Sequence, residues 1–169
     1  MAWFLYTQAC HRKQYKEYII TGTSLLYLYE GSECMAVINV TPLMNINALI
    51  ASDNVNEGDV LLLEEGIYFQ TVNVQKSNIR IAAKGPGVIF DGRVILFTAF
   101  TLSNVVGVVI EGINIRNYRF ESIIVQSASG NRIIKNSIIN SPLSDGIRLI
   151  NSSGNLTRCA SFELPKIYE

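Results

Sequence analysis

Short alternations of apolar and polar residues fill the chain between residues 103 and 155. Ile113 and Ile115, for example, are aliphatic side chains separated by one residue, a spacing that predicts a strand with one buried face. Gly, Asn, Ser and Asp separate such pairs, and these residues favour turns and tolerate left-handed backbone. Helical spacing does not occur in this region, so the pattern predicts a series of very short strands.

The same region repeats itself with a period of 23 to 24 residues, since 140 − 117 = 23 and 154 − 130 = 24. A strand too short for a hairpin that recurs at a fixed period is expected to pair with its copy in the next unit. Stacked units then form a solenoid with parallel strands about 4.8 Å apart. We also expect Asn117 and Asn140 to stack as an internal asparagine ladder. The matched segments are 110–117 with 133–140, 121–125 with 145–149, and 129–131 with 153–155.

A short helix is predicted before the repeats. Thr41 and Pro42 have the character of an N-cap and a first helical residue, and the helix is expected to end near residues 52–54. It would cover a strand edge that otherwise invites aggregation. The fold class predicted from the sequence is therefore all-β, a right-handed parallel β-helix (solenoid) with a short N-terminal capping helix. The apolar stripe of this helix consists of Leu43, Ile46, Leu49 and Ile50.

The two ends of the chain lack the pattern of the middle. One permitted back-translation of residues 30–34 places a purine-rich GGGAG just before the codon of Met35, as in a bacterial ribosome-binding site. We therefore predict that Met35 is the natural start and that residues 1–34 are translated upstream sequence; the alternative is an extension that packs on the body. The β-helix domain is predicted to span residues 35–155. Residues 156–169 are then a degenerate last coil or a truncated tail, and an open C-terminal edge predicts self-association.

Composition narrows the possible partners. The chain is 49% hydrophobic and 17% charged, which excludes a disordered protein. Fourteen basic residues balance fourteen acidic ones, so no nucleic acid partner is expected. The apolar runs are too short to span a bilayer, so no membrane partner is expected either. Cys10, Cys34 and Cys159 have no disulfide or metal spacing. Basic residues follow the first apolar stretch instead of preceding it, so no secretory signal is visible.

The segment GDVLLLEEGIY at residues 58–68 resembles the opening "GD-strand-x-x-G-x-Y" of pectate-lyase-like parallel β-helix proteins. Residues 85–92 resemble their following coil, and the later repeats match the generic parallel β-helix repeat. The resemblance covers about residues 41–155. It implies a fold more than a function, because this scaffold hosts lyases, hydrolases, esterases, adhesins, phage tailspikes and copper-delivery proteins. It also implies polysaccharide handling and an extracellular or cell-surface location.

This resemblance directs the search for chemistry to carboxylates and arginine. The patterns of polygalacturonase-type hydrolases are absent from the predicted domain, and the only histidine, His11, lies before it. Pectate-lyase-type chemistry binds Ca²⁺ through clustered carboxylates and uses an arginine to remove a proton. The repeat places Glu121 one coil beneath Asp145, so these acids are the candidate Ca²⁺ ligands. Arg148 is expected to point outward and is the candidate catalytic residue. The alternative is that all three are ordinary turn or solvated residues.

Three classes of function are compatible with the sequence. The first is a non-catalytic β-helix repeat protein that serves as a carbohydrate-binding, surface or structural module. The second is a calcium-dependent polysaccharide lyase, or a fragment of one. The third is a fragment with no independent function. Missing hydrolase signatures and the small number of coils favour the first class. Polysaccharide is the expected partner, and no cofactor is expected beyond the Ca²⁺ of the lyase alternative.

Overall fold

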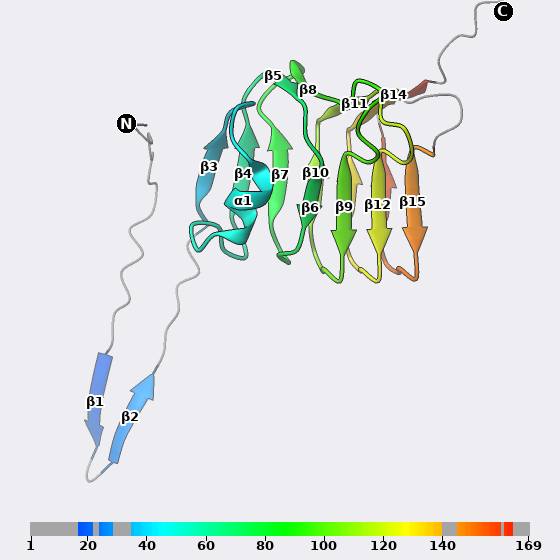
Figure 1. Ribbon diagram of the computed structural model, residues 1–169. Coiled ribbons are helices and arrows are strands. Elements are labelled where there is room, and N and C mark those ends of the chain that lie inside the picture. Colours follow the sequence, from blue (N-terminus) through cyan, green and yellow to red (C-terminus); the bar gives the residue numbers. More distant parts are fainter. Residues whose placement is uncertain (1–16, 22–23, 29–34, 140–144, 160, 164–169) are drawn as a thin grey trace, which may run out of the picture.

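The structure, a computed structural model, describes residues 17–21, 24–28, 35–139, 145–159 and 161–163. It is an all-β parallel solenoid with one short helix near its N-terminal end (Figure 1). Before the solenoid, β1 (Glu17–Thr21) and β2 (Ser24–Leu28) form an antiparallel pair. The predicted β-helix is thus confirmed, whereas its right-handedness and the proposed domain boundaries stay predictions.

Three parallel sheets form the walls of the solenoid, and each complete coil contributes one strand to each sheet. Sheet B contains β3 (Val37–Val40), β4 (Val60–Leu63), β7 (Arg80–Ala83), β10 (Val109–Glu111), β13 (Arg132–Ile134) and β16 (Leu156–Arg158). Sheet C contains β5 (Gly66–Tyr68), β8 (Val88–Asp91), β11 (Asn114–Arg116), β14 (Ser137–Ile139) and β17 (Ser161–Glu163). Sheet D contains β6 (Val72–Val74), β9 (Phe100–Ser103), β12 (Ile123–Gln126) and β15 (Ile147–Ile150).

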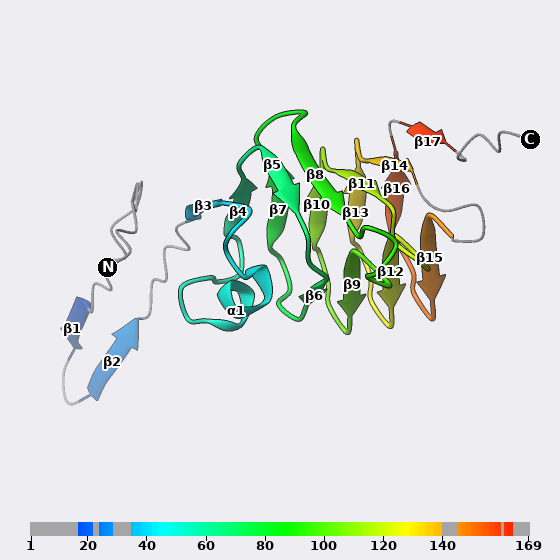
Figure 2. The same cartoon turned by 45° about the horizontal axis from the view of Figure 1, so that its top comes forward.

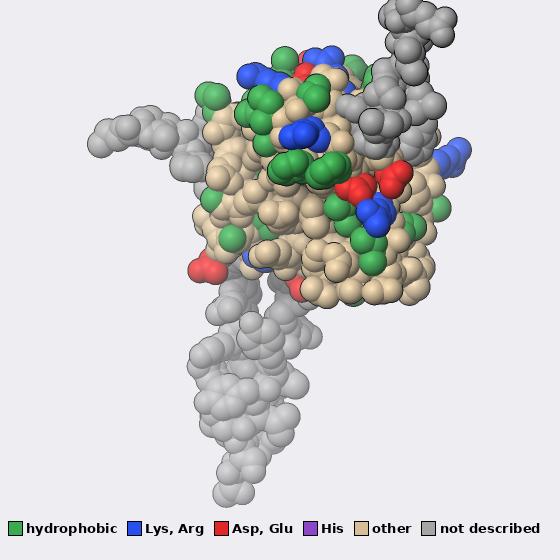
Figure 3. Space-filling model, turned by 45° about the vertical axis from the view of Figure 1, so that its right-hand side comes forward, with side chains coloured by type: hydrophobic (Ala, Val, Ile, Leu, Met, Phe, Trp, Pro, Cys, Tyr) green, Lys and Arg blue, Asp and Glu red, His purple; other side chains and the backbone are tan. Residues whose placement is uncertain are grey.

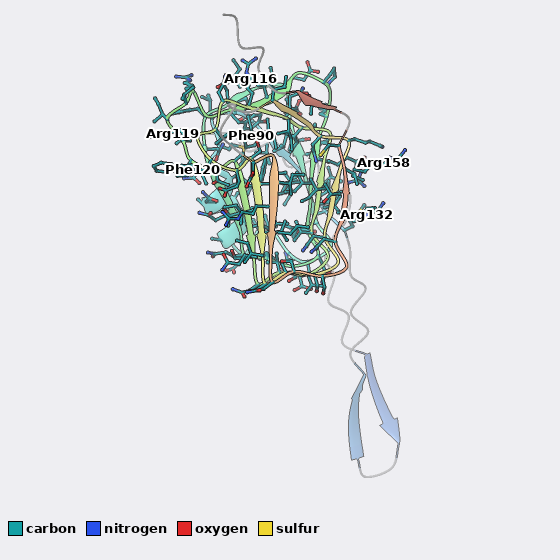
Figure 4. The ribbon with its side chains drawn as sticks, turned by 90° about the vertical axis from the view of Figure 1, so that its right-hand side faces the viewer. Phe90, Arg116, Arg119, Phe120, Arg132 and Arg158 are labelled. Carbon is teal, nitrogen blue, oxygen red and sulfur yellow. The ribbon has the colours of Figure 1, made fainter. Side chains whose placement is uncertain are left out.

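The predicted register is present in all three sheets. The paired residues include Ile110 with Ile133, Ile115 with Ile138, Ile123 with Ile147, and Ser129 with Ser153. The alternating aliphatic residues point inward, and the interior they fill is closed to solvent from β4 to β13. Phe90 lies inside the solenoid (Figure 4), between the stacked ring of Tyr68 at 4.9 Å and the tilted ring of Phe100 at 4.7 Å. Removal of this apolar surface from water is the main stabilising contribution.

The motif that carried the family resemblance serves the architecture. Asp59 is fully buried, and its two carboxylate oxygens accept hydrogen bonds from the backbone N–H groups of Ala36 (2.8 Å) and Asn56 (2.7 Å). The Tyr68 hydroxyl is 2.8 Å from the carbonyl oxygens of Val40 and Glu64. Burial, followed by the Glu64 charge, raises the pKa of Tyr68 to about 12. These residues therefore tie neighbouring coils together.

The capping helix begins later than the sequence predicted. α1 spans Ile46–Ala51, and Asn45 is its N-cap because the Asn45 Oδ1 accepts the Ala48 N–H at 3.0 Å. The prediction of Thr41 as N-cap was wrong: Thr41 instead opens a turn, its carbonyl accepting the Met44 N–H at 3.0 Å. Leu43 lies in this turn and is 98% exposed. Asn45 was overlooked because Pro42 is an equally good starting signal.

α1 ends sheet D in the place of a further strand (Figure 2). Ile46 and Ile50 of its inner side are buried. Outside them, the side-chain amide of Asn47 donates to the Thr71 carbonyl at 2.7 Å and accepts the Asn73 N–H at 2.7 Å. The helix therefore satisfies both the apolar interior and the polar edge of β6.

An asparagine ladder that was not predicted from the sequence joins Asn131 to Asn155. Asn131 is fully buried, its Oδ1 accepts the Val108 N–H at 2.9 Å, and its Nδ2 donates to Asn155 Oδ1 at 3.0 Å. Asn117 instead donates to Asp91 Oδ1 at 3.0 Å. Its predicted partner, Asn140, lies outside the described residues.

The last coil differs from the coils inside the stack. Leu149 faces inward, in register with the fully buried Val125, yet it is 50% exposed because no further described strand covers β15. β16 and β17 continue the parallel pairing to Glu163. Self-association through this end stays a prediction.

Candidate functional site

The connections from sheet C to sheet D vary in length, and this variation locates the candidate site. Between β5 and β6 the connection is residues 69–71, between β8 and β9 it is residues 92–99, and between β11 and β12 it is residues 117–122. Val72 consequently pairs with Phe100 at an offset of 28 (100 − 72), whereas Phe100 pairs with Ile123 at an offset of 23. Insertions in repeat proteins form loops on one face, which is often the binding face.

Two phenylalanines from neighbouring coils stack at this edge. The rings of Phe97 and Phe120 lie 5.2 Å apart with an interplanar angle of 14°. They are 54% and 53% exposed, although a backbone hydrogen bond of 3.0 Å from the Phe120 N–H to the Phe97 carbonyl holds the two connections together. Figure 3 shows hydrophobic side chains gathered beside basic and acidic ones on the surface. A large exposed aromatic pair of this kind is typical of a binding surface.

Two arginines accompany the aromatic rings. The Arg119 guanidinium lies 5.5 Å from the centre of the Phe97 ring, and the Arg93 guanidinium lies 4.8 Å from the centre of Phe69. Cation–π attraction at exposed sites contributes about 0.5–1 kcal/mol. Figure 4 shows Arg119 and Phe120 projecting from the same side of the solenoid. We call this surface the aromatic edge; it comprises Phe69, Arg93, Phe97, Arg119 and Phe120.

A buried tyrosine fixes the backbone beneath the aromatic edge. Tyr118 is fully buried, and its hydroxyl donates to the Gln70 carbonyl at 2.8 Å. Burial, with a smaller effect of the Asp91 charge, raises the pKa of Tyr118. A Cβ atom at Gly92 would lie 2.7 Å from the Asn117 carbonyl oxygen and 2.9 Å from the Tyr118 ring. Glycine is therefore required where the two connections meet.

The longest connection holds strained backbone. Arg93 and Val94 have φ values of 51° and 57°, the left-handed region that β-branched residues rarely adopt. The Val94 N–H donates to the Asn117 carbonyl at 2.7 Å, which helps to hold this conformation. Such strain costs on the order of 1–3 kcal/mol per residue and tends to occur at ligand-binding sites.

Asp91 anchors the same connection. Asp91 and Gly92 form a turn pair, and the Asp91 Oδ1 accepts the Arg93 N–H at 2.9 Å. Its Oδ2 also accepts Arg116 Nε at 2.9 Å. Burial raises the pKa of Asp91, but hydrogen bonds from Asn117, the Arg93 backbone and Arg116 outweigh it, so the pKa is lower than usual.

The three residues predicted from the sequence come together beside the aromatic edge. The Ser122 N–H donates to the Asp145 carbonyl at 3.2 Å, which places Glu121 and Asp145 on adjacent coils. Arg148 is exposed on the outer face of sheet D, paired with Ile124 in register, as expected. Its Nη1 also donates to Glu121 Oε1 at 2.8 Å.

This contact determines the charge balance of the group. The Arg148 hydrogen bond lowers the pKa of Glu121, and the Glu121 hydrogen bond and charge raise the pKa of Arg148, with a smaller effect from Asp145. Two carboxylates, one already neutralised by a guanidinium, are few for Ca²⁺, which takes about six to eight oxygen ligands. No group of three or more His, Cys, Asp or Glu side chains that could hold a metal occurs in the part of the chain that the structure describes.

A groove of mixed polar and apolar lining lies at the other end of sheet D, where α1 meets β6. Its volume is about 560 Å³. Across the sheet, Asn73 at the groove is in register with Thr101, then Ile124, then Arg148. An outward row of side chains therefore runs along the solenoid axis from the groove to the acid–arginine group. The groove is lined by Asn47, Ala48, Ile50, Ala51, Asn73, Gln75 and Lys76.

Comparison of the chain with protein-family models, with curated proteins and with solved structures finds no match. The pectate-lyase-like superfamily therefore stays a resemblance, and function rests on the geometry of the surface. Among the described residues, no helix is long and apolar enough to cross a membrane.

The sequence interpretation missed the aromatic edge. A signal was present, because 120 − 97 = 23 equals the repeat period, so Phe97 and Phe120 could have been aligned like the aliphatic ladders. The residues around Phe97 do not match those around Phe120, however, and the insertion hid the alignment.

Cys159, the one cysteine among the described residues, is free and partly buried, and burial raises the pKa of its thiol.

Proposed function

We propose that this protein is a non-catalytic carbohydrate-binding β-solenoid and that a glycan chain packs on the aromatic edge. The observation that carries the proposal is the exposed stack of Phe97 on Phe120. Full burial of a phenylalanine side chain contributes about 1.5–3 kcal/mol to the free energy of unfolding. Two phenylalanines that stay half exposed therefore lose about the stabilisation of one fully buried side chain. A ligand that covers both rings recovers this contribution.

The surroundings of the rings suit a sugar. The flat apolar ring faces pack against the C–H face of a pyranose, while the guanidiniums of Arg93 and Arg119 donate hydrogen bonds to its oxygens. Ligand sites commonly combine apolar contact with a few well-placed polar groups. The outward row on sheet D offers the amide of Asn73 and the hydroxyl of Thr101 for further sugar units.

The test is binding to a panel of soluble polysaccharides by isothermal titration calorimetry. The double variant Phe97→Ala/Phe120→Ala is expected to weaken binding by at least tenfold while the melting temperature changes little. Leu43→Ala is the matched control, because it truncates an exposed apolar residue in the turn before α1, away from the aromatic edge. Undiminished affinity of the double variant, or no binding to any glycan of the panel, would overturn the proposal.

A second candidate, the calcium-dependent polysaccharide lyase, is favoured by one observation: Glu121, Asp145 and Arg148 do assemble beside the aromatic edge. The same polysaccharides are incubated with and without Ca²⁺, and new unsaturated chain ends are followed by ultraviolet absorbance. Constant absorbance under both conditions is expected of the binding module. An increase in absorbance that requires Ca²⁺ and is lost in Arg148→Gln would contradict the binding module and support the lyase.

A further inference from the structure

The outer face of sheet B concentrates positive charge in a chain that has no net charge. Because side chains alternate along a strand, the residues flanking each inward aliphatic point outward. The face presents five basic and two acidic residues, a net charge of +3. We call it the basic face; its residues are Arg80, Lys84, Arg132, Lys135, Arg158, Glu64 and Glu111.

Both carboxylates of the basic face are already neutralised. Glu64 accepts Lys84 Nζ at 2.7 and 2.9 Å through its two oxygens. Glu111 accepts Lys135 Nζ at 3.0 Å through one oxygen and Arg80 through the other. The Lys135 hydrogen bond and the Arg80 charge lower the pKa of Glu111 despite its partial burial. These two acids therefore have no charge left for the remaining arginines.

Arg132 and Arg158 are the remaining cations, and within the described residues neither forms an ion pair. Arg132 is in register with Leu156, and Ile134 with Arg158, so arginines and aliphatics alternate on two neighbouring strands. From strand spacing and rise, the two arginine Cα atoms lie about 8 Å apart. Both side chains are exposed and project from the same side, opposite to Arg119 and Phe120 (Figure 4).

We propose that the basic face binds a linear polysaccharide that carries sulfate esters. The cations follow one another from β7 to β16, along the solenoid axis, and the strands are only three or four residues wide. This stripe fits an extended chain better than a broad bilayer. The guanidiniums of Arg132 and Arg158, unpaired within the described residues, supply both charge and a planar set of donors, and guanidinium binds oxyanions in bidentate fashion.

The inference goes beyond the proposed function and does not depend on it, because the two surfaces share no residue. It predicts salt-sensitive binding of dextran sulfate to the full chain, measured by isothermal titration calorimetry at about 50 and 200 mM salt. Arg132→Gln/Arg158→Gln is expected to lose at least tenfold in affinity with an unchanged melting temperature. Lys76→Gln/Arg116→Gln removes the same number of charges outside both the basic face and the aromatic edge, and it is expected to lose less than twofold.

Three results would overturn the inference. Equal losses in the two double variants would show non-specific attraction. Equal affinity for polygalacturonate would show that charge density does not decide recognition. Binding to vesicles of anionic phospholipid, but not to dextran sulfate, would show that the face meets a bilayer instead. The proposed function is judged separately, by Phe97→Ala/Phe120→Ala on the polysaccharides that bind the aromatic edge.

Discussion

The chain leaves sheet D through turns of constant length and enters it through connections of variable length. The turns from sheet D to sheet B have five residues in every coil: 75–79, 104–108, 127–131 and 151–155. In the first three coils of the repeat, the connections from sheet C to sheet D have three, eight and six residues. The constant turns form the backbone column that sets the register, whereas the variable connections carry the exposed aromatics and the strained backbone.

The constant turns are held by identical backbone geometry. Gly107, Gly130 and Gly154 have φ values of 69°, 64° and 63°, and they stack in one column. The buried amide of Asn131 then joins one turn to the next. Little of this turn can change without disturbing its neighbours. The other connections can take added residues without loss of the ladder, and the proposed glycan site lies there.

The largest expected effect that separates the two regions comes from Asn131. Asn131→Ala leaves the buried Val108 N–H without a partner and breaks the bond to Asn155, so we expect a loss of about 2–4 kcal/mol in the free energy of unfolding. Chemical denaturation measures it. Phe97→Ala in the variable connection should cost less than about 1 kcal/mol, and a larger cost for Phe97→Ala than for Asn131→Ala would reverse the comparison.

A smaller effect is expected from the glycine column. Gly130→Val places a β-branched residue at a φ of 64°, which should cost about 1–3 kcal/mol through backbone strain. No side chain blocks the site, since a Cβ there would be 4.0 Å from the Gly107 nitrogen. Gly130→Asn is the control and should lose less, because Asn78 holds the equivalent place in its own turn at a φ of 56°. Equal losses in urea denaturation would contradict the strain argument.

The smallest expected effect concerns the charges of the variable connection. The folded state lowers the pKa of Glu121, so its stabilisation is present above the ordinary glutamate pKa of about 4.3 and is lost as the pH falls through the folded value. Arg148→Gln should therefore lower the melting temperature slightly at pH 7, and its difference from the wild-type protein should shrink as the pH falls below the ordinary glutamate pKa. A difference that persists undiminished at pH 3 would show that packing of Arg148, and not its charge, stabilises the fold.

Much of the fold could be predicted from the sequence because the inward positions of the last coils are occupied by aliphatic residues. Ile110 and Ile133, or Ile123 and Ile147, align without any structural knowledge, and the register follows. The coil between Val72 and Phe100 was not readable in this way, since its extra residues break the period. The start of α1 was misplaced because local capping signals compete, and the bond between Asn45 and Ala48 decides the outcome.

The candidate site was predicted only in part. The repeat correctly placed Glu121 one coil before Asp145, with Arg148 facing outward. That Arg148 reaches back to Glu121 depends on side-chain rotamers, which sequence spacing does not define. The aromatic edge and the basic face arise from residues that become neighbours only through stacking. A balanced total charge hid the excess of cations on the outer face of sheet B.

The side chain of Asn47 imitates a peptide unit at the first edge of sheet D. Its amide presents one donor and one acceptor to β6, as a preceding strand would, but it offers no continuing backbone beyond them. Among the described residues, β15 is the other end strand of sheet D and has no side chain in the place that Asn47 takes beside β6. The two ends of sheet D therefore differ, and the predicted self-association is expected at β15 and not at β6.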